Sequence, residues 1–185
     1  MQGGVLPLTV PGIPMLFMGQ ELYETGVFEF PSPSPLEWDN SHSGIRTLYR
    51  DAITLRRNLT AQTRGLTGPT MTIFHQNDAA KVMAWLRRSS GGPGDDTVVV
   101  ANFSATDFSF GYQIGVPSPG TWQIRFTTDS QTYDTAFSTP ATATTTLTTQ
   151  ATPLQGYPQR LNIPRLPPYT LLILSQDAPN TWWLY

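Results

Sequence analysis

The feature that most limits how this chain can fold is an uncharged apolar run near its start, "VPGIPMLFMGQ" at 10–20, which ends at the sequence's first charged side chain, Glu21. The run is too short to span a bilayer, which takes about 20 apolar residues, and it lacks the basic start and cleavage site of a signal peptide. Short apolar runs between Pro and Gly are typical of fully buried strands. We therefore predict a strand at 15–18, which needs neighbours on both sides.

The overall composition excludes several classes of protein. The formal net charge of −2 and the pI of about 5.6 show no basic excess, so we expect no nucleic-acid partner, and we expect no membrane partner either. The absence of Cys excludes disulfides and thiolate metal sites and is compatible with the cytoplasmic location that we expect. The 17 Pro and 15 Gly indicate many turns, which favour an all-β protein over a helical bundle.

One clear helix is predicted at 43–58, because apolar residues recur there at steps of three and four. We expect Ser43 to cap its start, and Arg56 and Arg57 in its last turn favour the helix dipole. The apolar stripe consists of Ile45, Leu48, Tyr49, Ala52, Leu55 and Leu59.

After residue 65, short β-branched and aromatic runs alternate with turn residues. The predicted strands are 71–75, 81–88, 97–104, 109–116, 121–128 and 169–176. The composition of 89–96 indicates a hairpin loop, and the uncharged, Thr-rich segment 135–159 is interpreted as a long loop with one edge strand at 144–148. Regular strand spacing of this kind predicts a β-sandwich or Greek-key barrel. Asn58 and Asn102 begin glycosylation triplets, which we interpret as chance matches.

Several motifs resemble the α-amylase superfamily, glycoside hydrolase family thirteen, and are most similar to bacterial 1,4-α-glucan branching enzymes. "PGIPMLFMGQE" and "PLEWDNSHSGIRTLYRDAITLRRN" resemble the eighth strand of the catalytic (β/α)8 barrel and the segment leading into its last helix. "DDTVVVANFS", "YQIGVPSPGTWQIRFTTDS" and "LPPYTLLILSQ" resemble the C-terminal all-β domain of these enzymes. The likeness runs from Val10 to Gln176.

The resemblance implies a mainly β chain: a C-terminal all-β Greek-key sandwich preceded by the last strand and helix of a (β/α)8 barrel. The expected divisions are 1–65 for the end of the barrel, 66–178 for the all-β domain and 179–185 for a tail. Strand 15–18 would find its neighbours in upstream sequence that this chain lacks. The rest of the barrel, or a second copy of the chain, is therefore the expected partner that covers its edge.

The resemblance also implies that the catalytic residues are missing. The family's three carboxylates follow earlier barrel strands, and neither "G-F-R-x-D" nor "N-H-D" occurs in this sequence. Retaining glycoside chemistry needs an acid and a nucleophile about 5–5.5 Å apart. We therefore assign no catalytic residue, no metal and no cofactor, and we expect no catalysis by the chain alone.

Four residues are candidates for contact with α-1,4-glucan. Gln20 and Glu21 follow the end of the expected barrel strand, on the face where (β/α)8 barrels carry their active sites, although Glu21 could equally cap local backbone. Trp38 and His42 belong to the next loop, which borders the glucan groove in the family. We favour an interpretation of Trp38 as an apolar anchor under that loop over one as a sugar-stacking ring, and His42 could lie beside the helix start.

Two functions of different classes remain open. The first is a non-catalytic C-terminal fragment of a branching-enzyme-like protein that supports the barrel and contacts glucan. The second is a stand-alone β-sandwich module that binds carbohydrate or a protein partner. Aromatic residues at strand positions fit a sandwich core, but one or two of them could form a glucan platform. These residues are Trp85, Phe103, Tyr112, Trp122 and Phe126.

Overall fold

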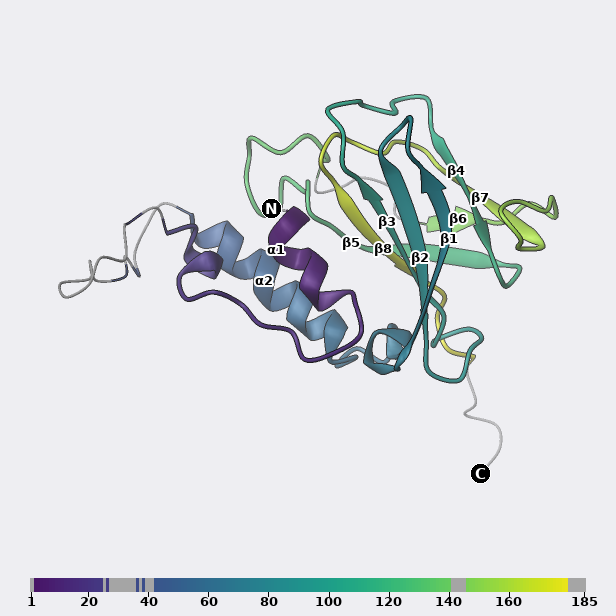
Figure 1. Cartoon of the computed structure of the whole chain (residues 1–185), viewed down its shortest axis with the longest axis horizontal. Coiled ribbons are helices and arrows are strands. Elements are labelled where there is room, and N and C mark those ends of the chain that lie inside the picture. The colour runs from purple at the N-terminus through teal and green to yellow at the C-terminus, as the bar shows by residue number, and fades with distance from the viewer. Residues whose placement is uncertain are drawn as a thin grey trace.

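The computed structural model describes residues 2–24, 26, 36, 38, 42–140 and 146–179, and it places a small helical part beside two β-sheets (Figure 1). The helical elements are α1 (Gln2–Val5), η1 (Leu6–Leu8), η2 (Gln20–Leu22), α2 (Ser43–Arg56) and η3 (Arg64–Thr67). The strands are β1 (Thr70–Asn77), β2 (Val82–Arg88), β3 (Thr97–Asn102), β4 (Tyr112–Val116), β5 (Thr121–Thr127), β6 (Thr146–Thr148), β7 (Gln159–Ile163) and β8 (Leu171–Ser175). Among the described helices, none is long and apolar enough to cross a membrane.

The strands form two antiparallel sheets. The larger has the order β1-β2-β3-β8-β5-β6, and the smaller pairs β4 with β7. The sequence therefore predicted the all-β C-terminal domain correctly, including the hairpin loop at 89–96 and the edge strand now seen as β6. It missed β7, which directly follows the segment interpreted as a long loop.

The central strands of the large sheet are buried on both faces, which explains their continuous apolar sequences. In β3, Val99 and Ala101 pack with the helical part, while Val98 and Val100 pack with the small sheet. The helix-side core takes Val5, Leu8, Ile45, Leu48, Tyr49, Ala52 and Leu55 from the N-terminal part and Trp85, Phe126, Leu171 and Ile173 from the sheet. Both parts of the chain therefore share one hydrophobic core.

The predicted strand at 15–18 is wrong. Within the described part of the chain no strand forms there, and Met15, Phe17 and Met18 are 84%, 67% and 59% exposed. A strand requires a neighbour that takes up its backbone hydrogen bonds, and the segment lies instead against the helical elements, where Leu16 alone of the four is partly buried. The preceding Pro residues and Gly12, with φ of +107°, also interrupt extended structure before it.

Helix α2 confirms the predicted helix, with its end two residues earlier than expected. The five apolar residues of its predicted stripe that lie within α2 are buried, whereas Leu59, beyond its end, is exposed. The expected cap by Ser43 is wrong, because His42 occupies the cap position and makes no side-chain capping bond. The burial of its apolar face, and not a side-chain cap at its start, therefore stabilises this helix.

Two arginines bind backbone carbonyls where the helical part meets the large sheet, and only Arg87 belongs to a strand. The fully buried Arg87 of β2 donates from Nη1 to the Thr9 carbonyl at 2.6 Å and from Nη2 to the Leu66 carbonyl at 3.0 Å. Arg56 of α2 donates to the same Leu66 carbonyl at 2.6 Å. Arg87 also reaches the carbonyls of Gly68 and Thr70, and Arg56 those of Val10 and Gly12. Burial, with a smaller contribution from the Arg56 charge, lowers the pKa of Arg87 to about 10.

Candidate functional site

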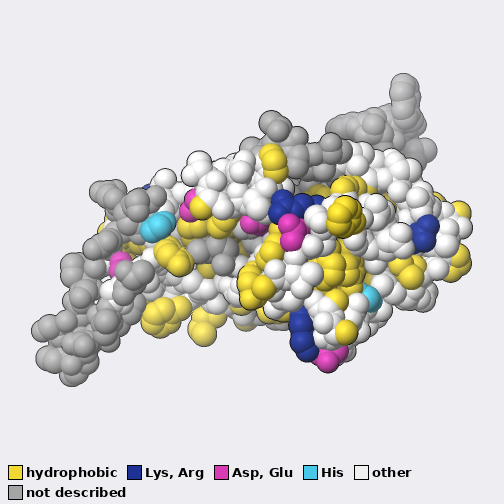
Figure 2. Space-filling model, turned by 90° about the horizontal axis from the view of Figure 1, so that it is seen from above, with side chains coloured by type: hydrophobic (Ala, Val, Ile, Leu, Met, Phe, Trp, Pro, Cys, Tyr) yellow, Lys and Arg dark blue, Asp and Glu magenta, His cyan; other side chains and the backbone are white. Residues whose placement is uncertain are grey.

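A groove of about 540 Å³ lies between η2 and the outward side of α2. It is lined by Leu16, Glu21, Arg46, Tyr49, Arg50, Ile53, Thr54, Arg57 and Leu59. The described lining residues include one carboxylate, that of Glu21, and the three guanidinium groups of Arg46, Arg50 and Arg57. The exposed apolar segment 13–18 contributes Leu16 to the same groove. Figure 2 shows hydrophobic side chains exposed over this helical part as well as over the sheets. The groove therefore offers both polar and apolar contacts to a ligand or a partner.

Gln20 is tied to its surroundings rather than directed at a ligand. Its Oε1 accepts the Phe17 N–H at 3.2 Å, and its side chain bonds to the hydroxyl of the buried Tyr49. A Cβ on Gly4 would lie 1.8 Å from that hydroxyl, so α1 closes over this bond. Burial raises the pKa of Tyr49, the Gln20 bond opposes the rise, and the nearby Glu21 charge adds to it. Gln20 thus positions the turn that carries Glu21.

Two of the other predicted site residues lie on η2 and directly before α2. Glu21 is half-buried on the groove, and the Tyr23 and His42 rings meet edge to face at 5.0 Å, which joins the end of η2 to the start of α2. Trp38 is 59% exposed, which contradicts its interpretation as a buried anchor. The structure therefore brings Gln20, Glu21 and His42 to one region, with the Trp38 ring open to solvent.

Acidic groups are scarce among the described residues that line the groove. Glycoside hydrolysis needs two carboxyl groups on either side of one bond, and Glu21 is the only acidic residue among those described as lining the groove. No group of His, Cys, Asp or Glu in the described part of the chain could hold a metal ion.

The five strand aromatics divide into core and surface. Trp122 is buried between the two sheets, as the sandwich-core interpretation predicted, whereas Trp85 and Phe126 are buried on the other face of the large sheet, against the helical part. Tyr112 is half-buried, and Phe103 is 42% exposed at the end of β3, beside a second groove of about 150 Å³. Phe103 is thus the one of the five whose exposure allows it to serve as a surface platform.

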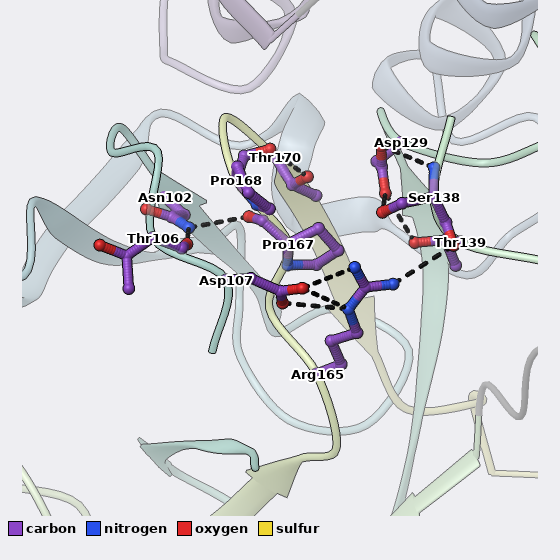
Figure 3. A network of polar contacts seen from close by, with 10 residues as sticks. All are labelled: Asn102, Thr106, Asp107, Asp129, Ser138, Thr139, Arg165, Pro167, Pro168 and Thr170. Carbon is purple, nitrogen blue, oxygen red and sulfur yellow. Dashed lines mark hydrogen bonds and ion pairs between the residues drawn. The ribbon is translucent and has the colours of Figure 1, made fainter. Parts of the chain in front are cut away.

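A polar network that no sequence motif predicts joins three loops at one end of the sandwich (Figure 3). Arg165 makes a two-pronged ion pair with Asp107, the shortest contact being 2.7 Å, and donates to the Ser138 carbonyl at 3.2 Å. Asp129 accepts bonds from the N–H and hydroxyl of Ser138. The hydrogen bond and charge of Arg165 lower the pKa of Asp107. Residues so far apart in sequence form no local motif, so only the fold reveals this support.

Asn102 belongs to the same end of the sandwich and has a structural role. Its fully buried amide donates to the carbonyls of Thr106 and Pro167, each at 2.8 Å, and accepts from the N–H and hydroxyl of Ser104. All of the amide's polar atoms are therefore engaged, which agrees with a chance glycosylation match at this position.

Comparison with known proteins gives the chain its family. The family described as "Alpha amylase, C-terminal all-beta domain" matches residues 73–177. The chain is 37% identical over 132 residues to the 1,4-alpha-glucan branching enzyme GlgB of Cupriavidus pinatubonensis, covering 66% of this chain and 17% of the relative. The enzymes of the same name from Roseobacter denitrificans and Cupriavidus necator are 36% identical over 130 residues and 31% identical over 177 residues.

The matches cover different shares of the two chains. They take in 66% of this chain for the Roseobacter enzyme and 90% for the C. necator enzyme, but only 17% and 22% of those relatives. The chain thus spans about a fifth of the length of the curated relatives it matches. The family match covers more than half of the chain and coincides with the two sheets. This chain therefore belongs to the family of α-amylase C-terminal all-β domains.

Proposed function

We propose that this chain works as the C-terminal part of a branching-enzyme-like protein, without catalysis of its own, and that it supports a catalytic barrel through its helical part. The observation that carries the proposal is the contiguous exposure of apolar side chains at 13–18. Ile13 is 99% exposed, Met15 84% and Phe17 67%. Contiguous exposed apolar surface of this kind marks an interaction site.

The hydrophobic free energy favours docking of another protein surface onto segment 13–18. Removing one large apolar side chain from water contributes roughly 1.5–3 kcal/mol, so several such side chains on one segment give a strong driving force for docking. A neighbouring barrel strand would also supply the backbone partners that residues 15–18 need to become a strand. A second copy of the chain is the competing occupant of this surface, and sedimentation equilibrium distinguishes the two.

A glucan contact at the groove is the second part of this proposal. Glu21 and Arg50 of the groove offer an acceptor and donors for sugar hydroxyls. Trp38, which precedes α2 in the chain and is exposed, offers a flat apolar ring. The relatives are named as enzymes of 1,4-alpha-glucan, and a polymer of that kind has both apolar ring faces and hydroxyl edges.

A cytoplasmic location is likewise part of the proposal, and cell fractionation tests it.

A chimera tests the supporting role. The segment of the C. necator enzyme that matches 90% of this chain is replaced by this chain, and amylose branching is followed by iodine absorbance. We expect an active chimera that Phe17→Asp inactivates. Phe110→Asp is the matched control, because Phe110 is fully exposed in the β domain, far in sequence from the docking segment. A folded chimera without activity, or equal effects of the two variants, would contradict the proposal.

The alternative function, a stand-alone carbohydrate-binding module, draws on a different observation. Phe103 is partly exposed beside Gln76, Asp78 and Lys81, which line the second groove at the β1–β2 turn. Titration of the isolated chain with maltoheptaose tests it. Saturable binding that Phe103→Ala abolishes and Trp38→Ala leaves intact favours the module, whereas the reverse pattern favours a glucan contact through Trp38.

A further inference from the structure

His75 connects the two sheets of the β domain. It lies half-buried on β1 of the large sheet, and its Nε2 is 2.7 Å from the hydroxyl of Tyr112, on β4 of the small sheet. Its Nδ1 is 2.8 Å from Nε2 of Gln155, in the turn that precedes β7. Both ring nitrogens therefore bond across the interface between the layers.

The direction of these bonds is set by one backbone group. The Gly115 N–H lies 2.9 Å from the Gln155 side-chain oxygen and can only donate, so that atom is the acceptor Oε1. The other end of the amide, Nε2, must then donate to His75 Nδ1, which has to be unprotonated. The neutral ring consequently carries its proton on Nε2 and donates it to the Tyr112 hydroxyl.

The Gln155 side chain has little freedom to move elsewhere. Gln155 has φ of +53° and Gly156 φ of +83°, and Leu154 and Tyr157 exchange backbone hydrogen bonds around them, which defines a tight turn. This turn packs so closely on β4 that a Cβ on Gly115 would lie 2.1 Å from the Leu154 carbonyl oxygen. A left-handed conformation at a non-glycine residue is strained and persists only where its surroundings hold it.

We propose that His75, Gln155 and Tyr112 form a proton-sensitive clasp, which joins the two sheets when His75 is neutral and loosens when His75 is protonated. Protonation places an N–H at Nδ1 directly opposite the NH₂ group of Gln155. Rotation of the amide would restore that bond but would turn the NH₂ group onto the Gly115 N–H. In either case one of the two hydrogen bonds of the Gln155 side chain, to His75 or to the Gly115 N–H, is lost, and a charge is placed in a half-buried site.

Among the described groups that face the ring, no carboxylate compensates this charge. Tyr112 is the titratable group facing the ring from β4, Gln155 of the turn is neutral, and Ala84 is the residue opposite on β2. On β1 itself, Asn77 is also neutral and donates to Tyr112 at 3.3 Å. None of the ion pairs among the described residues includes His75.

The pH range follows from the sign of the shift. Burial lowers the pKa of His75 below its ordinary value of 6.5. Because the unfolded chain then takes up the proton first, the clasp stabilises the domain fully above about pH 6.5, and this contribution is lost as the pH falls toward the lower pKa of the folded state.

Nitrogen-15 NMR of the His rings in the full chain tests the proposal without any variant. We expect His75 to carry its proton on Nε2 at pH 7.5 and to titrate below 6.5. A ring protonated on Nδ1 at that pH, or a titration at or above 6.5, would overturn it.

Gln155→Glu tests the directional argument. A carboxylate can accept both the Gly115 N–H and an Nδ1–H, so this variant favours protonated His75 and should move its titration above 6.5. An unchanged titration in a folded variant would show that Gln155 does not set the ring's protonation. In urea unfolding between pH 7.5 and 5, His75→Gln should reduce the loss of stability on acidification, while His42→Gln, at the second His, should retain it.

Discussion

Two segments of this molecule are equally apolar in sequence but lie in opposite environments. Residues 98–101 (Val-Val-Val-Ala) are fully buried in β3, whereas three of the four residues at 15–18 (Met-Leu-Phe-Met) are exposed. β3 has hydrogen-bonded neighbours on both edges, β2 and β8, and a covering layer on each face. The described structure offers the earlier segment no such neighbours. The difference teaches that an apolar run specifies a need for burial, but the partner that satisfies it has to be supplied elsewhere.

The largest effect is expected when Arg87, which joins the helical part to the large sheet, is replaced. Arg87→Met leaves the buried carbonyls of Thr9 and Gly68 without their charged donor. It also removes one of the two charged donors to the Leu66 carbonyl, which keeps its bond to Arg56. Because each bond to a charged group contributes about 1.5–3 kcal/mol, we expect a loss on the order of 4 kcal/mol in the free energy of unfolding. Urea unfolding measures it. The exposed Arg57 provides the control, since Arg57→Met should change stability by less than about 0.5 kcal/mol. Equal losses would mean that the junction is not a principal support.

A matched pair of isoleucines tests the contrast between the segments directly. Ile173 of β8 is 1% exposed and Ile13 is 99% exposed. We expect Ile173→Ala to cost about 3 kcal/mol, because a buried cavity forms, and Ile13→Ala to change stability by less than about 0.5 kcal/mol in the isolated chain. Thermal and urea unfolding measure both. A substantial cost at Ile13 would indicate that the first segment is already buried in solution, for instance by self-association.

A smaller effect is expected at the β2–β3 loop. The carboxylate of Asp95 accepts the N–H groups of Ser89, Ser90 and Gly91 at 2.5–2.9 Å, so Asp95→Ala should cost about 2 kcal/mol. Burial would raise the pKa of Asp95, but the three N–H groups outweigh it and lower the pKa below 3.8.

The lowered pKa of Asp95 gives this prediction a pH signature. Its contribution is complete above about pH 3.8 and is lost as the pH falls through the lower pKa of the folded state. Asp95→Ala should therefore have its largest effect near neutral pH and almost none in strong acid, as followed by urea unfolding at several pH values. Asp177→Ala, at an exposed carboxylate, should have a smaller effect. A pH-independent loss at Asp95 would exclude the carboxylate as its cause.

The sequence predicted most strands of the β domain because their pattern is local. β-branched and aromatic runs between Gly- and Pro-rich turns are recognisable without knowledge of the partner strand. β7 was missed because its sequence, Gln-Arg-Leu-Asn-Ile, follows a Thr-rich segment and contains only two apolar residues. Those two, Leu161 and Ile163, are fully buried, so pairing with β4 and the core of the small sheet make it a strand.

The candidate site was predictable only in part. The resemblance made Gln20, Glu21, Trp38 and His42 candidates, but it did not reveal that Gln20 is bound to Tyr49 or that Trp38 is exposed. Both depend on contacts between segments that are distant in sequence.

By itself, the sequence determined the positions of α2 and of most strands, and it determined the family, because period, turn residues and short motifs are properties of neighbouring residues. Tertiary structure alone decided that β8 inserts between β3 and β5, that Arg87 meets the Thr9 carbonyl 78 residues away, and that His75 bonds to Tyr112 and Gln155. A buried donor or acceptor must find a partner, and which partner is available depends on how the whole chain packs.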